Sequence, residues 1–304
     1  MKTKRIVVLM LALSIIAACF SGCKMSFTST NPLDSTKFKV EDGKISISGY
    51  TDRTTITEYV IPDEYEIDGK TYPITKIADF GLCNAESLTR ITIGKNVEEI
   101  QPWSMTNNQH LTEFAVDPAN EHFTAVDGVL FTKDMKTIVY YPPAKGVTFD
   151  KYGQVQLKKE KIKIGKEQAE VETYKDIPTY EIPDSVEVIA PKAFYKCYYL
   201  NVTHFPSALK SIGEKAFFQV YEQLDFDMPA TIEFIGKDAF AYVDKLTKID
   251  LGGSIQEIEE YAFFNCTRLN EINVAKKEAD IKLGNKWQPT EKGRIRKDCT
   301  VTFA

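Results

Sequence analysis

Between residues 182 and 274, one pattern of apolar and polar positions repeats four times at intervals of 23 residues. Each copy places a branched apolar residue, an isoleucine, an alanine and a phenylalanine at fixed distances, with polar residues between them. Self-similarity at a fixed period of this length indicates a repeat architecture. The four columns are Val186, Leu209, Ile232 and Ile255; Ile189, Ile212, Ile235 and Ile258; Ala193, Ala216, Ala239 and Ala262; and Phe194, Phe217, Phe240 and Phe263.

The same frame recurs upstream in a degenerate form, in which small residues other than alanine occupy the alanine column. The interval from Ile100 to Ile189 is 89 residues, which is not a multiple of 23, so an insertion breaks the phase. The sequence therefore predicts about six coils, in repeat blocks at 70–116 and 182–274. The upstream pairs, each 23 residues apart, are Ile74 and Val97, Ile77 and Ile100, Leu82 and Met105, and Leu88 and Leu111.

A unit of 23 residues cannot bury its own apolar face, so we expect neighbouring units to stack as a solenoid around one long core. In each unit the pattern Leu-x-x-Ile-x-Ile predicts a short parallel strand, with Leu246, Ile249 and Leu251 pointing inward. A Pro or Gly then turns the chain, and the Ala-Phe segment is predicted to form a short helical or 3₁₀ turn. The predicted fold class is a strand-dominated α/β solenoid with a short parallel sheet.

The segments outside the repeats are predicted to form caps and a protrusion. Asp42 and Gly43 lie between two alternating runs, which is a hairpin signal. Val301–Phe303 is predicted as a last strand, and alternating runs within the Lys/Glu-rich stretch 150–178 favour a hairpin that protrudes from the solenoid. The predicted segments are an N-terminal cap at 37–69, an inter-repeat segment at 117–181 and a C-terminal cap at 275–304.

The start of the chain predicts export. Three basic residues precede thirteen uncharged ones, too few to span a hydrocarbon core that needs roughly 20 helical residues. This pattern is typical of a secretory signal peptide, here at 1–22. Small residues come just before Cys19 and just before Cys23, and both junctions resemble the lipobox of bacterial lipoproteins. Cleavage would leave one of these cysteines as a lipid-modified N-terminus.

The sequence leaves the choice between Cys19 and Cys23 open, and an ordinary secreted protein with two incidental cysteines is the remaining alternative. Either cleavage removes the three basic residues, so the formal charge becomes -5 - 3 = -8. Residues 24–36, rich in Ser, Thr, Asn and Pro, are predicted to form a flexible tether. We therefore expect a lipoprotein that a lipid anchors to a bacterial membrane, such as the outer membrane, with exposure at the cell surface.

The repeat resembles that of the BspA-type (treponemal) leucine-rich repeat proteins, whose units end in Ile-Gly-x-x-Ala-Phe-x-x-Cys. Lys210–Phe217 and Asn265–Ile272 match this pattern closely, and Asp127–Asp134 resembles the segment between repeats in such proteins. The resemblance covers roughly residues 38–274, while the Lys/Glu-rich stretch 150–178 departs from it. It implies a surface protein associated with adhesion and with binding of host or matrix proteins, without naming one ligand.

Composition argues against several classes of function. The formal net charge is -5 and the 38 basic residues form no polybasic block, so nucleic acid is not an expected partner. Three His and six Cys are too few and too scattered for a zinc framework. Cys197 and Cys266, three coils or about 14 Å apart, are beyond disulfide reach and are expected in the core. Without a catalytic or phosphate-binding motif, we expect no enzyme activity, cofactor or metal.

The outward positions of the repeated strand form the candidate binding face. Asp227 and Asp250 would lie one rung apart, about 4.8 Å at the backbone, where like charges repel. Such a cluster could recruit a cation or a basic partner, and the alternative is a solvated polar face with Lys248 as a neighbour. The candidate binding face consists of His204, Asp225, Asp227, Asp250, Glu271 and Asn273.

The sequence favours a monomeric, non-enzymatic recognition and adhesion scaffold whose partners are extracellular or host proteins. The alternative is an envelope module that captures a nutrient glycan or peptide, and a hydrolase is a more distant possibility. Exposed aromatic residues on the sheet face would favour glycan capture, whereas a broad charged face would favour protein partners.

Overall fold

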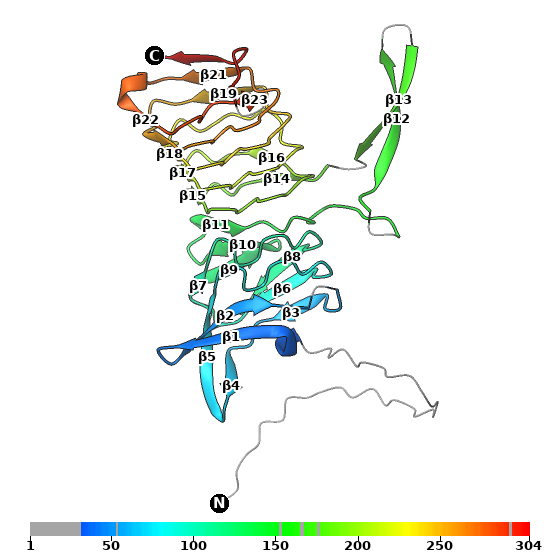
Figure 1. Ribbon diagram of the computed structural model, residues 1–304, viewed down its shortest axis with the longest axis vertical. Coiled ribbons are helices and arrows are strands. Elements are labelled where there is room, and N and C mark those ends of the chain that lie inside the picture. The colour runs from blue at the N-terminus through cyan, green and yellow to red at the C-terminus, as the bar shows by residue number, and fades with distance from the viewer. Residues whose placement is uncertain (1–31, 53, 152–153, 165–166, 175–176, 292–293) are drawn as a thin grey trace, which may run out of the picture.

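The structure is a computed structural model that describes residues 32–304, except 53, 152–153, 165–166, 175–176 and 292–293. Short coils stack into an elongated body, with the first described strands at one end and the C-terminus at the other (Figure 1). The architecture is strand-dominated, as predicted.

A hairpin caps the N-terminal end of the stack. Its two strands pair antiparallel across Asp42 and Gly43, both of which have positive φ, as a tight two-residue turn requires. This confirms the hairpin predicted from these two residues. The second strand then pairs in parallel with the first repeat strand, so the cap continues directly into the stack. The elements here are η1 (Pro32–Ser35), β1 (Thr36–Glu41), β2 (Lys44–Tyr50), β4 (Glu64–Ile67), β5 (Lys70–Ile77) and β7 (Glu99–Ile100).

The predicted strand is present in most coils. Leu246, Ile249 and Leu251 are buried, at no more than 3% exposure, as predicted. The ladder is interrupted, because the segment 224–228 of one coil is not a strand. These strands pair in three groups: β3 (Glu58–Val60), β6 (Arg90–Ile93) and β8 (Glu113–Val116); β14 (Thr179–Glu181) and β16 (Asn201–His204); and β19 (Lys248–Leu251), β21 (Glu271–Val274) and β25 (Thr300–Phe303).

A second ladder, which we did not predict, follows the isoleucine column of the second block. Its strands are only two residues long in each coil, too short to show an alternating pattern in the sequence. They extend an antiparallel meander of the inter-repeat segment into an eight-stranded sheet. Its strands are β9 (Phe123–Val126), β10 (Val129–Thr132), β11 (Thr137–Tyr140), β15 (Val188–Ile189), β17 (Ser211–Ile212), β18 (Phe234–Ile235), β20 (Glu257–Ile258) and β22 (Lys282–Leu283).

The Ala-Phe segments are turns, so the prediction of short helical or 3₁₀ turns is wrong for the described coils. Lys192 and Lys215 start these turns with φ of 65° and 55°, which a right-handed helix does not accommodate. Alternate N–H groups leave the turn and bind the next coil, as Phe217 N does to Ala239 O at 2.7 Å. A helix would use these donors internally, so stacking replaces the helix here.

The core also differs from the predicted single core, because it forms two clusters. The inter-repeat strands β10 and β11 lie between them and contribute to both. Leu130 and Tyr140 pack in the N-terminal cluster, whereas Val129, Phe131 and Ile138 pack in the C-terminal one. The out-of-phase interval in the sequence thus corresponds to a partition between two stacked blocks.

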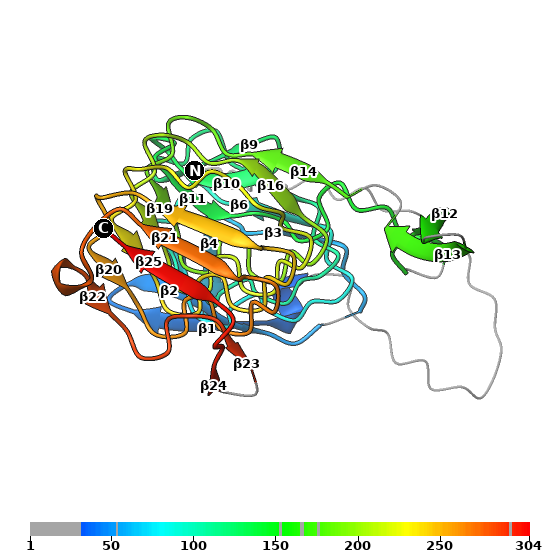
Figure 2. The same ribbon diagram turned by 90° about the horizontal axis from the view of Figure 1, so that it is seen from above.

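The remaining elements confirm two further predictions. The stretch 150–178 contains a hairpin that protrudes sideways from the stack (Figures 1 and 2). The strand predicted at Val301–Phe303 is β25, which pairs in parallel with β21 and covers the C-terminal end. The elements are β12 (Leu157–Ile164), β13 (Glu167–Tyr174), η2 (Glu278–Asp280), β23 (Thr290–Glu291) and β24 (Arg294–Ile295).

Candidate binding surface

The structure brings three residues of the candidate binding face together around Lys248. Its ammonium lies 3.2 Å from carboxylate oxygens of both Asp250 and Glu271. The amide of Asn273 donates to the same two carboxylates, at 2.8 and 2.7 Å. These hydrogen bonds, and then the lysine, hold the pKa of Asp250 and of Glu271 below their ordinary values. Each carboxylate is therefore already paired within the sheet face.

Asp225 occupies a different position, where it takes the place of a missing strand. One carboxylate oxygen accepts the backbone N–H of Thr247 at 2.6 Å and of Lys248 at 3.2 Å, and the other accepts the Thr247 hydroxyl. Burial alone would raise the pKa of Asp225, but these three hydrogen bonds outweigh it and hold the pKa below 3.8. The side chain thereby binds the start of β19.

The side chain of Gln223 supports the interrupted ladder in the same way. Its amide accepts the N–H of Val202 and donates to the carbonyl of Val202, both at 2.9 Å, as a neighbouring strand residue would. Val202 itself is buried, although its repeat position is an outward one. The register of β14 with β16 shifts by one residue here, which turns Val202 inward.

The other two predicted residues lie outside the Lys248 network. His204 Nε2 lies 3.0 Å from Asp184 Oδ1, and both residues line an open hollow with Glu181. Asp227 is exposed in the strand-free segment of its coil. The candidate binding face is thus a set of separate local arrangements along the stack.

The predicted lipidation residues Cys19 and Cys23 lie outside the described residues. Cys197 and Cys266 are fully buried, as expected for core residues. Burial raises the pKa of the Cys266 thiol to about 12. Within the described part of the chain, no cluster of His, Cys, Asp and Glu could hold a metal ion, and no helix has the length and apolarity to cross a membrane.

Sequence reasoning missed a row of aromatic rings along the turns, which we name the aromatic seam. Each contributing coil supplies one ring that is partly exposed, and consecutive ring centroids lie between 5.3 and 6.1 Å apart. The residue after each Ala-Phe pair is aromatic in three of four coils, and this signal could have revealed the seam. The aromatic seam consists of Phe80, Trp103, Tyr195, Phe218, Tyr242 and Phe264.

A second pair of rings lies on the next exposed column of the same turns. Tyr198 and Tyr221 stack with centroids 5.3 Å apart and planes 11° apart. Both rings are partly exposed. Burial raises the pKa of Tyr198 to about 12, so its hydroxyl remains a neutral donor throughout the physiological range.

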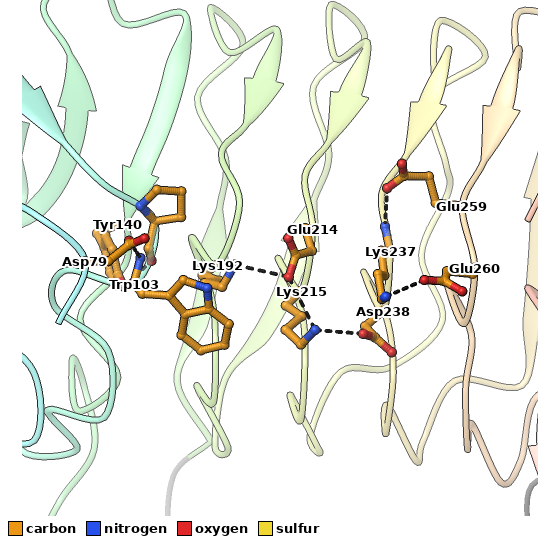
Figure 3. A network of polar contacts seen from close by, with 11 residues as sticks. Asp79, Trp103, Tyr140, Lys192, Glu214, Lys215, Lys237, Asp238, Glu259 and Glu260 are labelled. Carbon is orange, nitrogen blue, oxygen red and sulfur yellow. Dashed lines mark hydrogen bonds and ion pairs between the residues drawn. The ribbon is translucent and has the colours of Figure 1, made fainter.

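A ladder of ion pairs runs beside the seam from coil to coil (Figure 3). Lys192 lies 3.3 Å from Glu214, and Lys215 bridges Glu214 and Asp238 at 3.3 and 2.7 Å. Lys237 continues the ladder to Glu260. Charges of both signs are therefore paired along this edge, and they align neighbouring coils.

Trp103 lies next to the first lysine of the ion-pair ladder, at the boundary between the two repeat blocks. Figure 3 shows its indole beside Lys192, whose ammonium lies 4.1 Å from the ring centroid. The Lys192 side chain is 1% exposed, and burial lowers its pKa despite the pairing with Glu214. A cation–π contact and one carboxylate thus offset only part of the desolvation of this lysine.

Comparisons with known proteins agree with this architecture. The family model that matches is the BspA type leucine rich repeat region, in six copies, at residues 26–140 and 169–284. A search of the curated proteins finds no match.

Solved structures of bacterial leucine-rich repeat proteins are similar over most of the chain. The one from Eubacterium ventriosum has 13% identity and a TM-score of 0.50, covering 84% of this chain and 83% of that chain. A leucine rich cell surface protein from Faecalibacterium prausnitzii has 16% identity and a TM-score of 0.43, covering 90% and 97%. The T. pallidum leucine rich repeat protein has 17% identity and a TM-score of 0.37, covering 84% and 86%. The first of these likenesses supports the fold.

Asp225→Ala should reduce the free energy of unfolding by about 1 kcal/mol at neutral pH, because the start of β19 loses its acceptor. Asp225→Asn keeps an acceptor oxygen and should lose less. The pKa of Asp225 is lower in the folded state than in the unfolded state. The ionised carboxylate therefore stabilises the fold at any pH above the unfolded-state pKa, and this contribution is lost as the pH falls through the folded-state pKa.

Urea unfolding of wild type and both variants at about pH 7 and about pH 3 measures this. The difference between wild type and Asp225→Asn should shrink at the lower pH. An Ala variant as stable as wild type at neutral pH would show that Asp225 does not hold β19.

Proposed function

This chain belongs to the BspA-type leucine-rich repeat family, and we propose that it is a non-enzymatic recognition scaffold that binds protein partners outside the cell. The observation that carries this proposal is that partly exposed rings line the turns of successive coils, in the aromatic seam and in the neighbouring stacked pair Tyr198 and Tyr221. Aromatic side chains are enriched at protein interfaces, and their ordered rings lose little conformational entropy on binding.

Ring orientation favours a protein over a glycan. Tyr195 and Phe218 are only 18° from parallel, with centroids 5.3 Å apart, so each covers a face of the other. Ring edges and tyrosine hydroxyls are left for a partner, and these suit aromatic, carbonyl and backbone groups of a polypeptide. A sugar ring packs its C–H groups on an open aromatic face, which the stacked faces of this pair do not offer. The contacts of Tyr242 with Phe218 and with Phe264 are edge-to-face.

Capture of a glycan or peptide remains the alternative, and one observation favours it. Phe80, at the end of the seam, is 58% exposed. Its exposed ring could accept one sugar ring, although it is a single platform rather than a row. The sheet face carries the charged residues Lys248, Asp250 and Glu271 in place of rings.

The burial of two cysteines supports a non-enzymatic role. A catalytic cysteine needs a lowered pKa, whereas burial raises the pKa of both Cys197 and Cys266.

The proposed address is the cell surface, through a lipid on Cys19 or Cys23. This part of the proposal is supported by the signal-like start and the two lipobox-like junctions in the sequence.

Tyr198→Ala combined with Tyr221→Ala should weaken binding of a protein partner at least tenfold, or about 1.4 kcal/mol, because two central ring contacts are lost. The measurement is surface plasmon resonance against a panel of purified extracellular matrix proteins, with a glycan array run in parallel. Wild type should bind a matrix protein and the double variant should not.

The matched control is Asp244→Ala combined with Thr267→Ala, which changes the same repeat column two coils further along. These two residues share a hydrogen bond of 3.3 Å and carry no ring. Thermal melting of both double variants separates lost binding from lost folding. Equal affinity of the two double variants, or binding to glycans alone, would contradict the proposal of a protein partner.

Cys19→Ser and Cys23→Ser test the proposed lipid anchor. One of the two changes should abolish incorporation of a labelled fatty acid and release the protein from the membrane fraction of a bacterial host. If the double variant still incorporates the label as wild type does, neither cysteine carries the lipid.

A further inference from the structure

The protruding hairpin has two strand edges that the rest of the stack does not cover. Among the described strands, β12 and β13 pair only with each other. The pairing runs from Leu157 opposite Tyr174 to Ile164 opposite Glu167. Figures 1 and 2 show them projecting from the side of the stack. Each strand therefore offers one row of backbone N–H and C=O groups for pairing with another chain.

The two strands differ in charge. Strand β12 contains four lysines and one glutamate, whereas β13 contains three glutamates and no basic residue. Within the hairpin, Lys159 pairs in register with Glu172, and Lys161 with Glu170. One outer edge of the hairpin is thus basic and the other is acidic.

A single two-stranded hairpin is only marginally stable in water, and pairing with further strands stabilises it. The uncovered edges of β12 and β13 therefore favour the addition of a strand from another chain.

We propose that β12 of one copy pairs antiparallel with β13 of a second copy, so that hairpins of neighbouring molecules join into an open row. A twofold axis would instead place β12 beside β12, or β13 beside β13, where like charges face each other and destabilise pairing. Only a translated copy places a basic edge beside an acidic edge. Such a contact is heterologous, and because translation contains no closing rotation, its repetition extends into an open row.

Translation also keeps all copies in one orientation, as molecules attached to a single membrane require. The contact is small, so we expect it to be weak in dilute solution and populated when molecules are crowded on a surface. This is compatible with the monomer expected from the sequence. The proposal requires neither the lipid anchor nor an external partner.

The test uses a charge-swapped chain with four changes: Lys159→Glu, Lys161→Glu, Glu170→Lys and Glu172→Lys. The swap preserves opposite charges at both register pairs inside the hairpin, so the hairpin retains its own pairing. It reverses the charge of both edges. In the proposed β12–β13 contact, swapped chains can therefore join one another, whereas a swapped chain beside wild type places like charges together at either edge.

Donor-labelled and acceptor-labelled full-length chains are attached through a terminal affinity tag to vesicles that contain a metal-chelating lipid. Energy transfer between molecules is measured as surface density rises. Wild type with wild type and swapped with swapped should both show transfer, and wild type with swapped should lose it. Transfer should fall as salt rises from about 0.1 M to about 1 M, where the screening length drops from about 10 to about 3 Å.

Transfer between wild type and swapped chains equal to that of the matched pairs would overturn the proposal. Matched pairs that show no transfer beyond random crowding, measured with a chain lacking residues 157–174, would overturn it as well. Loss of transfer in the mixed pair alone supports it.

Discussion

Stacking of one coil on the next is the interaction on which the rest of the structure depends. The phenylalanine column forms a continuous stack of rings, with consecutive centroids 4.8, 5.1 and 5.5 Å apart, through Phe194, Phe217, Phe240 and Phe263. Alternate backbone N–H groups in the turns bind the neighbouring coil, and the N–H groups between them bind carbonyls of their own turn. Gly213 shows how close the coils come, because a Cβ there would lie 2.5 Å from the backbone nitrogen of Pro191. A single coil has no stable alternative for these groups.

Because the coils stack in phase, side chains at equivalent surface positions of successive coils line up in rows. In the aromatic seam, Tyr195, Phe218 and Phe264 occupy the same repeat position, and the ion-pair ladder beside it places lysines and acidic residues at two adjacent repeat positions of successive coils. A partner that binds such a row meets groups that are already ordered, so little entropy is lost there. The hairpin β12–β13 is an exception, since it belongs to no coil and has its own exposed edges.

The repeat columns could be predicted because burial constrains them directly. Ile235 and Phe240 are fully buried in the positions that their 23-residue spacing indicated. The conformation of the turns could not be predicted. Nothing in the sequence indicates that Lys192 adopts a φ of 65°, because stacking rather than intrinsic propensity stabilises this conformation. The pairing of Trp103 with Lys192 was also hidden, since these residues are 89 apart and out of phase with the repeat.

The candidate binding face was predictable only in part. Strand register correctly placed Asp250, Glu271 and Asn273 side by side. It could not show that Lys248 forms ion pairs with both carboxylates and that Asn273 donates hydrogen bonds to them, because these contacts depend on side-chain reach. Nor could it show that Gln223 and Asp225 replace backbone partners where a strand is missing, since they use side-chain groups in place of the regular ladder.

Deletion of one whole coil tests the dependence on stacking most directly. Removing residues 217–239 joins Ala216 to Phe240 and keeps every column in phase. The shortened chain should retain one cooperative thermal transition and the strand signature in circular dichroism, at a lower melting temperature, because one coil interface is lost. Removing only residues 217–228 shifts the columns and should abolish the transition. If both deletions melt alike, stacking in phase does not hold this protein together.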